Sequence, residues 1–181
     1  SGKSSFALML AHWFAGNDSA FPSHVRRSME PQHFGVARPR FVPVLVTCSR
    51  QPLALSILRS LLGVLDHNQG RGPKPRVYGE IQQLIDSKNE PTDEDLFSAI
   101  RQVNAKFISD SKSKGLLLIL DELGKFLEFA ALHPERQDIF LLQRLAETAA
   151  RSGDEPLFVV SLLHQGFNAY ADQLNQSSQR E

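Results

Sequence analysis

The sequence has one cysteine, Cys48, among its 181 residues. A single cysteine excludes an internal disulfide and a zinc site built from several cysteines. The 20 basic and 20 acidic side chains give no net charge, so no overall field directs the chain toward nucleic acid or an acidic membrane. No apolar run approaches the ~20 residues needed to cross a bilayer, and no internal repeat is evident. The 41% hydrophobic content predicts a single globular domain, and we expect a cytoplasmic protein with no membrane partner.

What is present begins with a short polar motif, Ser1-Gly2-Lys3-Ser4-Ser5, followed by an apolar stretch that ends before Gly16. The motif matches the second half of the pattern G-x-x-x-x-G-K-[ST]. In that pattern, backbone N–H groups wrap nucleotide phosphates, the lysine meets the terminal phosphates and the hydroxyl reaches Mg²⁺. The next helix aims its N-terminus at the same phosphates. Taken alone, these five residues fit a polar N-cap before a core helix equally well.

A second motif lies far downstream, where the aliphatic run 116–120 ends in Asp121 and Glu122. The run predicts a buried parallel strand, because it is short and does not alternate with polar residues. Carboxylates at the end of such a strand lie where open α/β sheets bind ligands. Asp121 is suited to hold Mg²⁺ through water, and Glu122 to polarise an attacking water. A strand followed by a helix N-cap is the simpler alternative, but both motifs in this order favour a nucleotide site.

These motifs carry a resemblance to a known family. Residues 1–5 resemble the end of a Walker A motif, and residues 116–122 resemble a Walker B motif with a catalytic glutamate. Together they are similar to P-loop ATPases of the AAA type, in the branch with an additional strand and a catalytic glutamate. The segments 121–128 and 162–165 also resemble large prokaryotic ATP-binding proteins.

The resemblance implies a P-loop NTPase fold, a three-layer α/β/α arrangement with a parallel sheet in the order 5-1-4-3-2. This chain would supply strands 2, 3 and 4 of that sheet. Its first core strand would be missing because the sequence starts inside the phosphate-binding loop, and its last would be missing because no fifth strand is predicted after residue 163. We expect residues 1–181 to form one such truncated domain, with an irregular insertion over residues 16–40.

The resemblance also implies roles for single residues, with ATP and Mg²⁺ as cofactors. The nucleotide would be bound by the motif at the start of the chain: Ser1, Gly2, Lys3, Ser4 and Ser5. Ser4 and Asp121 would hold the metal, and Lys3 and Glu122 would be catalytic. His164 or Gln165 would sense the terminal phosphate by hydrogen bonding. Two polar residues at a strand exit are an equally good interpretation of that last pair.

The function implied is ATP binding and Mg²⁺-dependent hydrolysis by the ATPase module of a larger protein, acting on attached domains or partner proteins. The alternative is a nucleotide-dependent switch or scaffold with little turnover. A small-molecule kinase would need arginines in a lid, and residues 167–181 offer only Arg180.

Other basic residues are candidates for partner contacts. In an oligomer, Arg144 or Arg151 could serve a neighbour as an arginine finger, although a role on a helix surface is favoured for both. A DNA-facing patch is a further hypothesis, but ordinary solvated charge is favoured because no aromatic residues interleave with the basic ones. The basic residues in question, all in predicted loops, are Arg26, Arg27, Arg38, Arg40, Arg71, Lys74 and Arg76.

Apolar spacing predicts the remaining elements. Pro43 indicates that the first strand is at a sheet edge or has a bulge near its start, and Thr92 is a predicted helix cap. The predicted helices are 6–15, 52–67, 77–87, 92–109, a short helical piece after Glu122 that includes Leu127 and Phe129, 136–151 and a helical tail over 167–181; the predicted strands are 41–48, 115–122 and a buried strand over 157–163.

Overall fold

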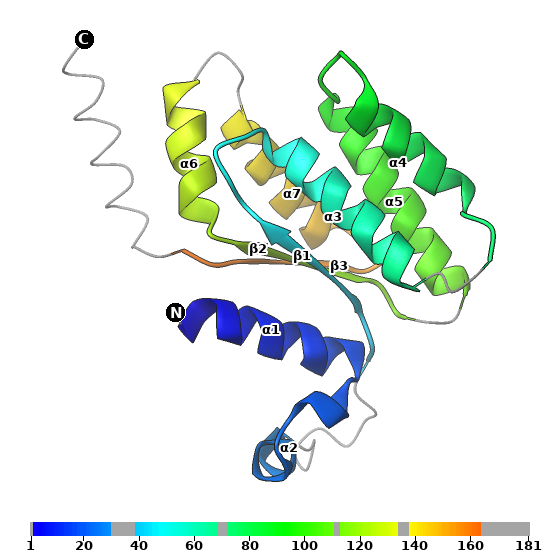
Figure 1. The fold of residues 1–181 in the computed structure, drawn as a ribbon, viewed down its shortest axis with the longest axis vertical. Coiled ribbons are helices and arrows are strands. Elements are labelled where there is room, and N and C mark those ends of the chain that lie inside the picture. The colour runs from blue at the N-terminus through cyan, green and yellow to red at the C-terminus, as the bar shows by residue number, and fades with distance from the viewer. Residues whose placement is uncertain (1, 30–38, 69–71, 111–112, 134–137, 164–181) are drawn as a thin grey trace, which may run out of the picture.

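The computed structural model describes residues 2–29, 39–68, 72–110, 113–133 and 138–163. Within these residues the chain is an α/β protein with a three-stranded parallel sheet and seven α-helices (Figure 1). In chain order the elements are α1 (Gly2–Ala15), the 3-10 helix η1 (Asp18–Ala20), α2 (Ser23–Met29), β1 (Val42–Thr47), α3 (Leu53–Asn68), α4 (Arg76–Asp86), α5 (Asp93–Ser109), β2 (Leu116–Asp121), α6 (Leu123–Leu132), α7 (Asp138–Ala150) and β3 (Leu157–Ser161).

The strands lie in the order β1-β2-β3. Both pairings are parallel, and Leu116 of β2 lies opposite Val42 of β1 and Leu157 of β3. The central strand β2 is buried along its whole length except at Asp121. Pro43 belongs to β1, so the prediction of an edge strand from this proline is confirmed for the described sheet.

Helices cover both faces of the sheet (Figure 1). On one face, α1 contacts β1 and β2. On the other face, α3 contacts β1 and α7 contacts β3, while α4 and α5 pack on α3. The larger hydrophobic core lies on this second side and includes Val44, Leu118 and Phe107. A smaller apolar cluster joins α1 to the sheet through Ala7, Ala11, Phe41, Leu117 and Ile119.

Local signals in the sequence explain where two helices begin and end. Helix α5 starts with a reciprocal cap: the Asp95 N–H donates to Thr92 Oγ1 at 3.2 Å, and the Thr92 N–H donates to Asp95 Oδ2 at 2.9 Å. Such a capping box satisfies two backbone donors that the helix itself leaves unpaired. Helix α1 ends before Gly16, whose φ of +73° is in the left-handed region that glycine favours. Both boundaries agree with the sequence prediction.

Three details differ from the sequence predictions. Helix α1 begins at Gly2 and not at residue 6, so the described part of the motif forms its first turn. The segment 16–40 is not wholly irregular, because η1 and α2 lie within it. Strand β3 is only partly buried, with Phe158 51% exposed, because in the described sheet it has a neighbouring strand on one side only. The predicted tail helix over 167–181 lies outside the described residues.

Candidate nucleotide site at the carboxyl edge of the sheet

Helix α1 runs antiparallel to the strands and places its first residues at their carboxyl ends. Its last turn is fixed at the opposite edge, where the Phe41 N–H donates to the Phe14 carbonyl at 2.8 Å just before β1 starts. A helix of 14 residues is about 21 Å long, and a strand of six residues spans about 20 Å. The first turn of α1 therefore reaches the edge where β2 ends in Asp121, and Figure 1 shows the N-terminal end of α1 on the side where β2 leads into α6.

The alternation of β2 places Asp121 on the same side of the sheet as α1. Leu117 and Ile119 belong to the cluster that contains Ala7 and Ala11 of α1. Side chains two residues apart share a face of a strand, so Asp121 continues this face at the carboxyl end. Its side chain is half-buried, and its Oδ1 accepts a hydrogen bond from the Glu122 N–H at 2.9 Å. The two sequence motifs thus converge on one edge and one face of the sheet.

Glu122 has a strained backbone. Its φ of 56° and ψ of 35° are left-handed, and it is the one non-glycine residue with positive φ in the described part of the chain. This conformation costs on the order of 1–3 kcal/mol for a residue other than glycine, and such residues cluster at functional sites. Glu122 is also the N-cap residue of α6, yet its side chain makes no capping hydrogen bond. Its Oε2 instead lies 2.6 Å from Lys125 Nζ.

The described residues of the first motif are well placed to meet an anion. Lys3 and Ser4 are half-buried, whereas Gly2 and Ser5 are exposed. The first turn of α1 holds no acidic residue, so no carboxylate there offsets the positive end of the helix dipole. A Cβ atom added to Gly2 would meet no atom within 4 Å, which leaves open space beside the backbone. Ser1 lies outside the described residues.

The other predicted site residues, His164 and Gln165, also lie outside the described residues. The chain that leads to them is held at the same edge. The Leu162 N–H donates to the Leu120 carbonyl at 2.9 Å, and the Leu123 N–H donates to the Leu162 carbonyl at 3.1 Å. The exit from β3 is therefore tied to the backbone on both sides of Asp121 and Glu122.

Cys48 is a neighbour of the site that the sequence analysis did not assign to it. It follows β1, and its N–H donates to the Asp121 carbonyl at 2.8 Å. The residue is buried, and burial raises the pKa of its thiol to about 12, with the negative charges of Asp121 and Glu122 adding to the rise. The available sequence signal was its position at the end of the predicted strand 41–48, because ligands of open α/β sheets bind at the carboxyl ends of the strands.

The described residues hold no group of three or more His, Cys, Asp or Glu side chains suited to bind a metal ion. The predicted ligands, Ser4 and Asp121, suit another kind of metal site, in which the protein supplies only some of the ligands. Mg²⁺ is commonly bound through one or two protein oxygens, several waters and the phosphates of its substrate. Ser4 and Asp121 supply oxygens of this kind, so these residues fit Mg²⁺ carried by a nucleotide and do not fit a metal held by protein ligands alone.

Two hollows on the surface lie away from this edge. One of about 380 Å³ is lined by residues of α5 and α7 and the turn before β3, including Asn104, Arg144 and Arg151. The other, of about 340 Å³, lies between α4 and α5. Neither is lined by Gly2, Lys3, Ser4, Ser5, Asp121 or Glu122.

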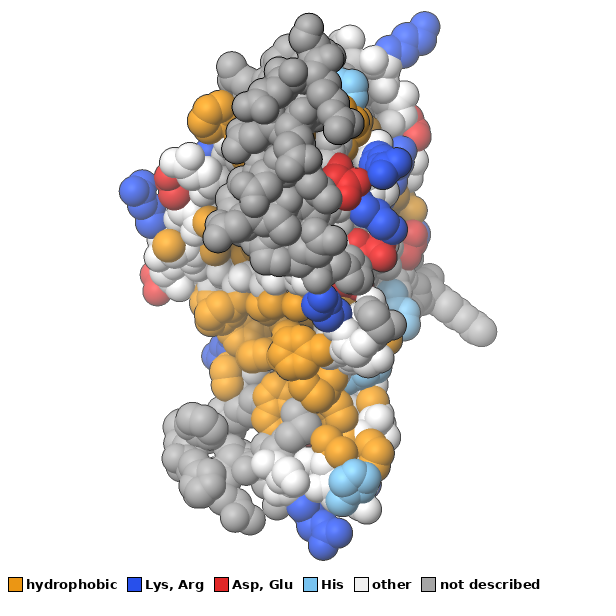
Figure 2. All heavy atoms as spheres, turned by 90° about the vertical axis from the view of Figure 1, so that its left-hand side faces the viewer, with side chains coloured by type: hydrophobic (Ala, Val, Ile, Leu, Met, Phe, Trp, Pro, Cys, Tyr) orange, Lys and Arg blue, Asp and Glu red, His pale blue; other side chains and the backbone are white. Residues whose placement is uncertain are grey.

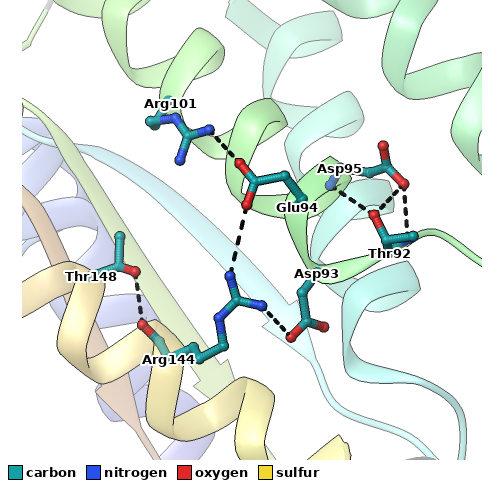
Figure 3. Close-up of polar contacts among 7 residues, drawn as sticks. All are labelled: Thr92, Asp93, Glu94, Asp95, Arg101, Arg144 and Thr148. Carbon is teal, nitrogen blue, oxygen red and sulfur yellow. Dashed lines mark hydrogen bonds and ion pairs between the residues drawn. The ribbon is translucent and has the colours of Figure 1, made fainter.

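Arg144, one of the two candidate arginine fingers, is engaged within the chain (Figure 3). Its guanidinium lies 2.7 Å from Asp93 and 3.8 Å from Glu94, at the start of α5, and 4.9 Å from the centre of the Phe97 ring. Arg101 pairs with the same Glu94 at 3.0 Å. This network joins α5 to α7 and gives Arg144 an evident structural role.

The basic residues proposed for a DNA-facing patch are dispersed. Arg26 and Arg27 lie on helix α2 and not in a loop, and Arg76 is the first residue of α4, where it pairs with Glu80 at 2.7 Å. Lys74 pairs with Asp66. Two members, at positions 38 and 71, lie outside the described residues. Lys74 and Arg76 are thus engaged in local ion pairs within the chain, and these contacts do not support a DNA-facing patch.

Comparisons with known proteins returned nothing: no family model, curated protein or solved structure matches the chain. In the described part of the chain, no helix is both long and apolar enough to cross a membrane.

Proposed function

We propose that this chain is a P-loop ATPase domain that binds ATP with Mg²⁺ and hydrolyses it, as the ATPase module of a larger protein. One observation carries the proposal. Lys3 and Ser4 begin a helix at the carboxyl edge of a parallel sheet, on the face to which Asp121 belongs. Two segments more than one hundred residues apart in the sequence thus bring a lysine, a hydroxyl and a carboxylate to one place. Ligands of open α/β sheets bind at this edge.

The order of the strands supports the same proposal. In the P-loop order 5-1-4-3-2, the second strand is at an edge, beside the third, which ends in the Walker B acids, and the fourth follows. The observed order β1-β2-β3 corresponds to these three strands, with Asp121 at the end of the middle one. This agreement concerns the order of the strands and the strand that ends in Asp121, so it does not depend on Lys3 or Ser4.

The roles of the residues follow from their chemistry. The N–H groups at the start of α1 and the Lys3 ammonium would bind the phosphates. The Ser4 hydroxyl and the Asp121 carboxylate would hold Mg²⁺, which when bound neutralises charge on the phosphate oxygens. Glu122 would accept a hydrogen bond from the attacking water and orient it toward the terminal phosphate. Hydrolysis would then be coupled to attached domains or partner proteins.

The experiment uses a form of the protein with a complete phosphate-binding loop and measures ATP affinity and turnover separately. We expect Lys3→Ala to weaken ATP binding at least about tenfold, because it removes a charge-assisted contact worth ~1.5–3 kcal/mol. Glu122→Gln should leave binding nearly intact and slow turnover by about 10²-fold or more. Lys106→Ala and Glu147→Gln, surface changes on α5 and α7, are the matched controls.

Each arm has an outcome that contradicts the proposal. Unchanged ATP affinity in Lys3→Ala would remove the basis for the phosphate site. Tight binding without turnover in the unaltered protein would favour the nucleotide-dependent switch over the ATPase. Loss of binding in Glu122→Gln, with hydrolysis per bound ATP retained, would show that Glu122 does not act on the water.

A further inference from the structure

The ion pair between Glu122 and Lys125 is a feature that the proposed roles leave unused. Lys125 lies in the first turn of α6, three residues after Glu122. Its Nζ lies 2.6 Å from Glu122 Oε2. The Lys125 side chain is 51% exposed and that of Glu122 27% exposed, so the lysine reaches from solvent over the carboxylate.

A purely structural role explains this pair poorly. Exposed ion pairs contribute little to the stability of a fold, because water competes for both charges. The start of α6 is already held by the backbone bond from Leu123 to Leu162. The Glu122 carboxylate does not cap the helix, although acceptors at that position usually do so. The pair therefore does little for α6 that other contacts do not already do.

The charges around Glu122 give the lysine a different task. Asp121 is the adjacent residue and carries a like charge, and the Cys48 thiol on the neighbouring strand end, whose pKa is raised to about 12, adds no charge. Further along α6, Glu128 is paired with Arg50 at 3.1 Å. Lys125 places a positive charge directly against Oε2 of the Glu122 carboxylate. A carboxylate has two oxygens, and a contact to Oε2 restricts where the other one points.

We propose that Lys125 is a positioning residue for ATP hydrolysis: it holds Oε2 of Glu122 so that the second carboxylate oxygen faces the attacking water. This inference rests on the proposed ATPase function. It assigns Lys125 no contact with the nucleotide. The backbone at Glu122 is fixed in a left-handed conformation, so Lys125 acts on the side-chain torsions that remain.

The test compares Lys125→Met with Lys125→Arg in a protein with a complete phosphate-binding loop. We expect Lys125→Met to lower kcat about fivefold and to leave the KM for ATP unchanged, because the lysine acts on the base and not on nucleotide binding. Lys125→Arg should restore most of the rate, since it keeps a positive donor. Arg50→Met, which breaks the neighbouring ion pair on α6, is the matched control and should leave kcat unchanged.

A double-mutant cycle identifies the group through which Lys125 acts. In the Glu122→Gln background, Lys125→Met should cause no further loss of turnover, because the carboxylate that it positions is gone. An equal loss in both backgrounds, a change in KM, or a rise in kcat in Lys125→Met would overturn the proposal.

The outcome also separates this inference from the function on which it rests. If the unaltered protein hydrolyses ATP and Lys125→Met has the same kcat, only the role of Lys125 is disproved. If the unaltered protein neither binds nor hydrolyses ATP, the proposed function is disproved, and this inference is disproved with it. Thermal unfolding of each variant shows whether it is folded, and the exposed position of Lys125 leads us to expect that all are.

Discussion

At the scale of single residues, burial beside the candidate site raises the pKa of the Cys48 thiol. The thiol is 1% exposed, and burial disfavours its charged form. The nearby charges of Asp121 and Glu122 disfavour that form further, so the pKa rises from 9.0 to about 12. Because the thiolate is the nucleophile of cysteine chemistry, the folded protein should keep its one cysteine unreactive.

This predicts two measurable properties. At pH 8 the native protein should react with iodoacetamide far more slowly than the urea-unfolded chain. The pKa is raised on folding, so the thiol's contribution to stability is present below about pH 9 and is lost as the pH rises from there toward about 12. The unfolding free energy of Cys48→Ala should lack this part of the decline above pH 9. Rapid alkylation of the native protein would contradict the burial of the thiol.

The sequence predicted the acids of the site but not the groups beside them. Asp121 and Glu122 were placed correctly, at the end of a strand, because an unbroken aliphatic run is a strong signal for a buried parallel strand. The contact of Cys48 with Asp121 depends on strand register, which the sequence does not specify. The spacing of Glu122 and Lys125 would have permitted an ion pair on a helix, but the helix boundary between them was not predictable to one residue.

At the scale of elements, the junction of β2 and β3 depends on a glycine. A Cβ atom on Gly115 would clash with the carbonyl oxygen of Pro156 and would lie 3.1 Å from an atom of the Phe41 ring. The same Pro156 oxygen accepts the Leu116 N–H at 3.0 Å, where β2 starts. The first residues of the two strands can therefore approach each other only if residue 115 has no side chain.

We expect Gly115→Ala to lower the unfolding free energy by about 3 kcal/mol, the upper part of the usual range for an overpacked site. The matched control is Gly63→Ala. Gly63 lies within α3, where an added Cβ meets no atom within 4 Å, and alanine should raise the unfolding free energy by about 0.5–1 kcal/mol. Denaturant unfolding of both variants checks the pair. Equal effects of the same sign would mean that the Gly115 contact is not the cause.

Elements with strong local signals were predicted well. The apolar spacing of α3 and the capping box of α5 are properties of short segments, so they could be seen without knowledge of the fold. The exposure of β3 could not be inferred in this way, because Phe158 and its neighbours look like a buried strand by composition. Their burial depends on which strands flank β3. Helix α2 was missed because its seven residues lie between prolines and carry little apolar periodicity.

At the scale of the whole molecule, α1 has two buried residues, whereas α3 on the opposite face of the sheet has seven. The buried residues of α1 are Ala7 and Ala11, both small. Phe6 is 45% exposed and Leu8 51% exposed, and Figure 2, which views the molecule from the left of Figure 1, shows hydrophobic side chains gathered on the surface at the level of α1. The helix that carries Lys3 and Ser4 therefore leaves part of its apolar surface exposed, although Leu10 and Phe14 pack partly buried against the smaller cluster.

We predict that α1 opens at a lower free energy than the rest of the fold. Amide hydrogen exchange should be faster for residues 6–14 than for residues 116–120 of the buried strand β2, because local opening follows the number of buried contacts. Under the proposed function, Mg-ATP should slow exchange in α1 more than in α5, which lies outside the candidate site. Equal protection of α1 and β2 without nucleotide would show that the helix unfolds only with the whole domain.

The position of Pro43 has a consequence for the newly made chain. Val42 of β1 pairs with Leu116, so at a synthesis rate of about 5–20 residues per second β1 waits roughly 4–15 s for its partner. During this time its backbone groups are available to strands of other chains. Pro43 has no N–H to offer. The residue that reveals an edge strand thus also shortens the stretch of β1 that could join an aggregate before β2 is synthesised.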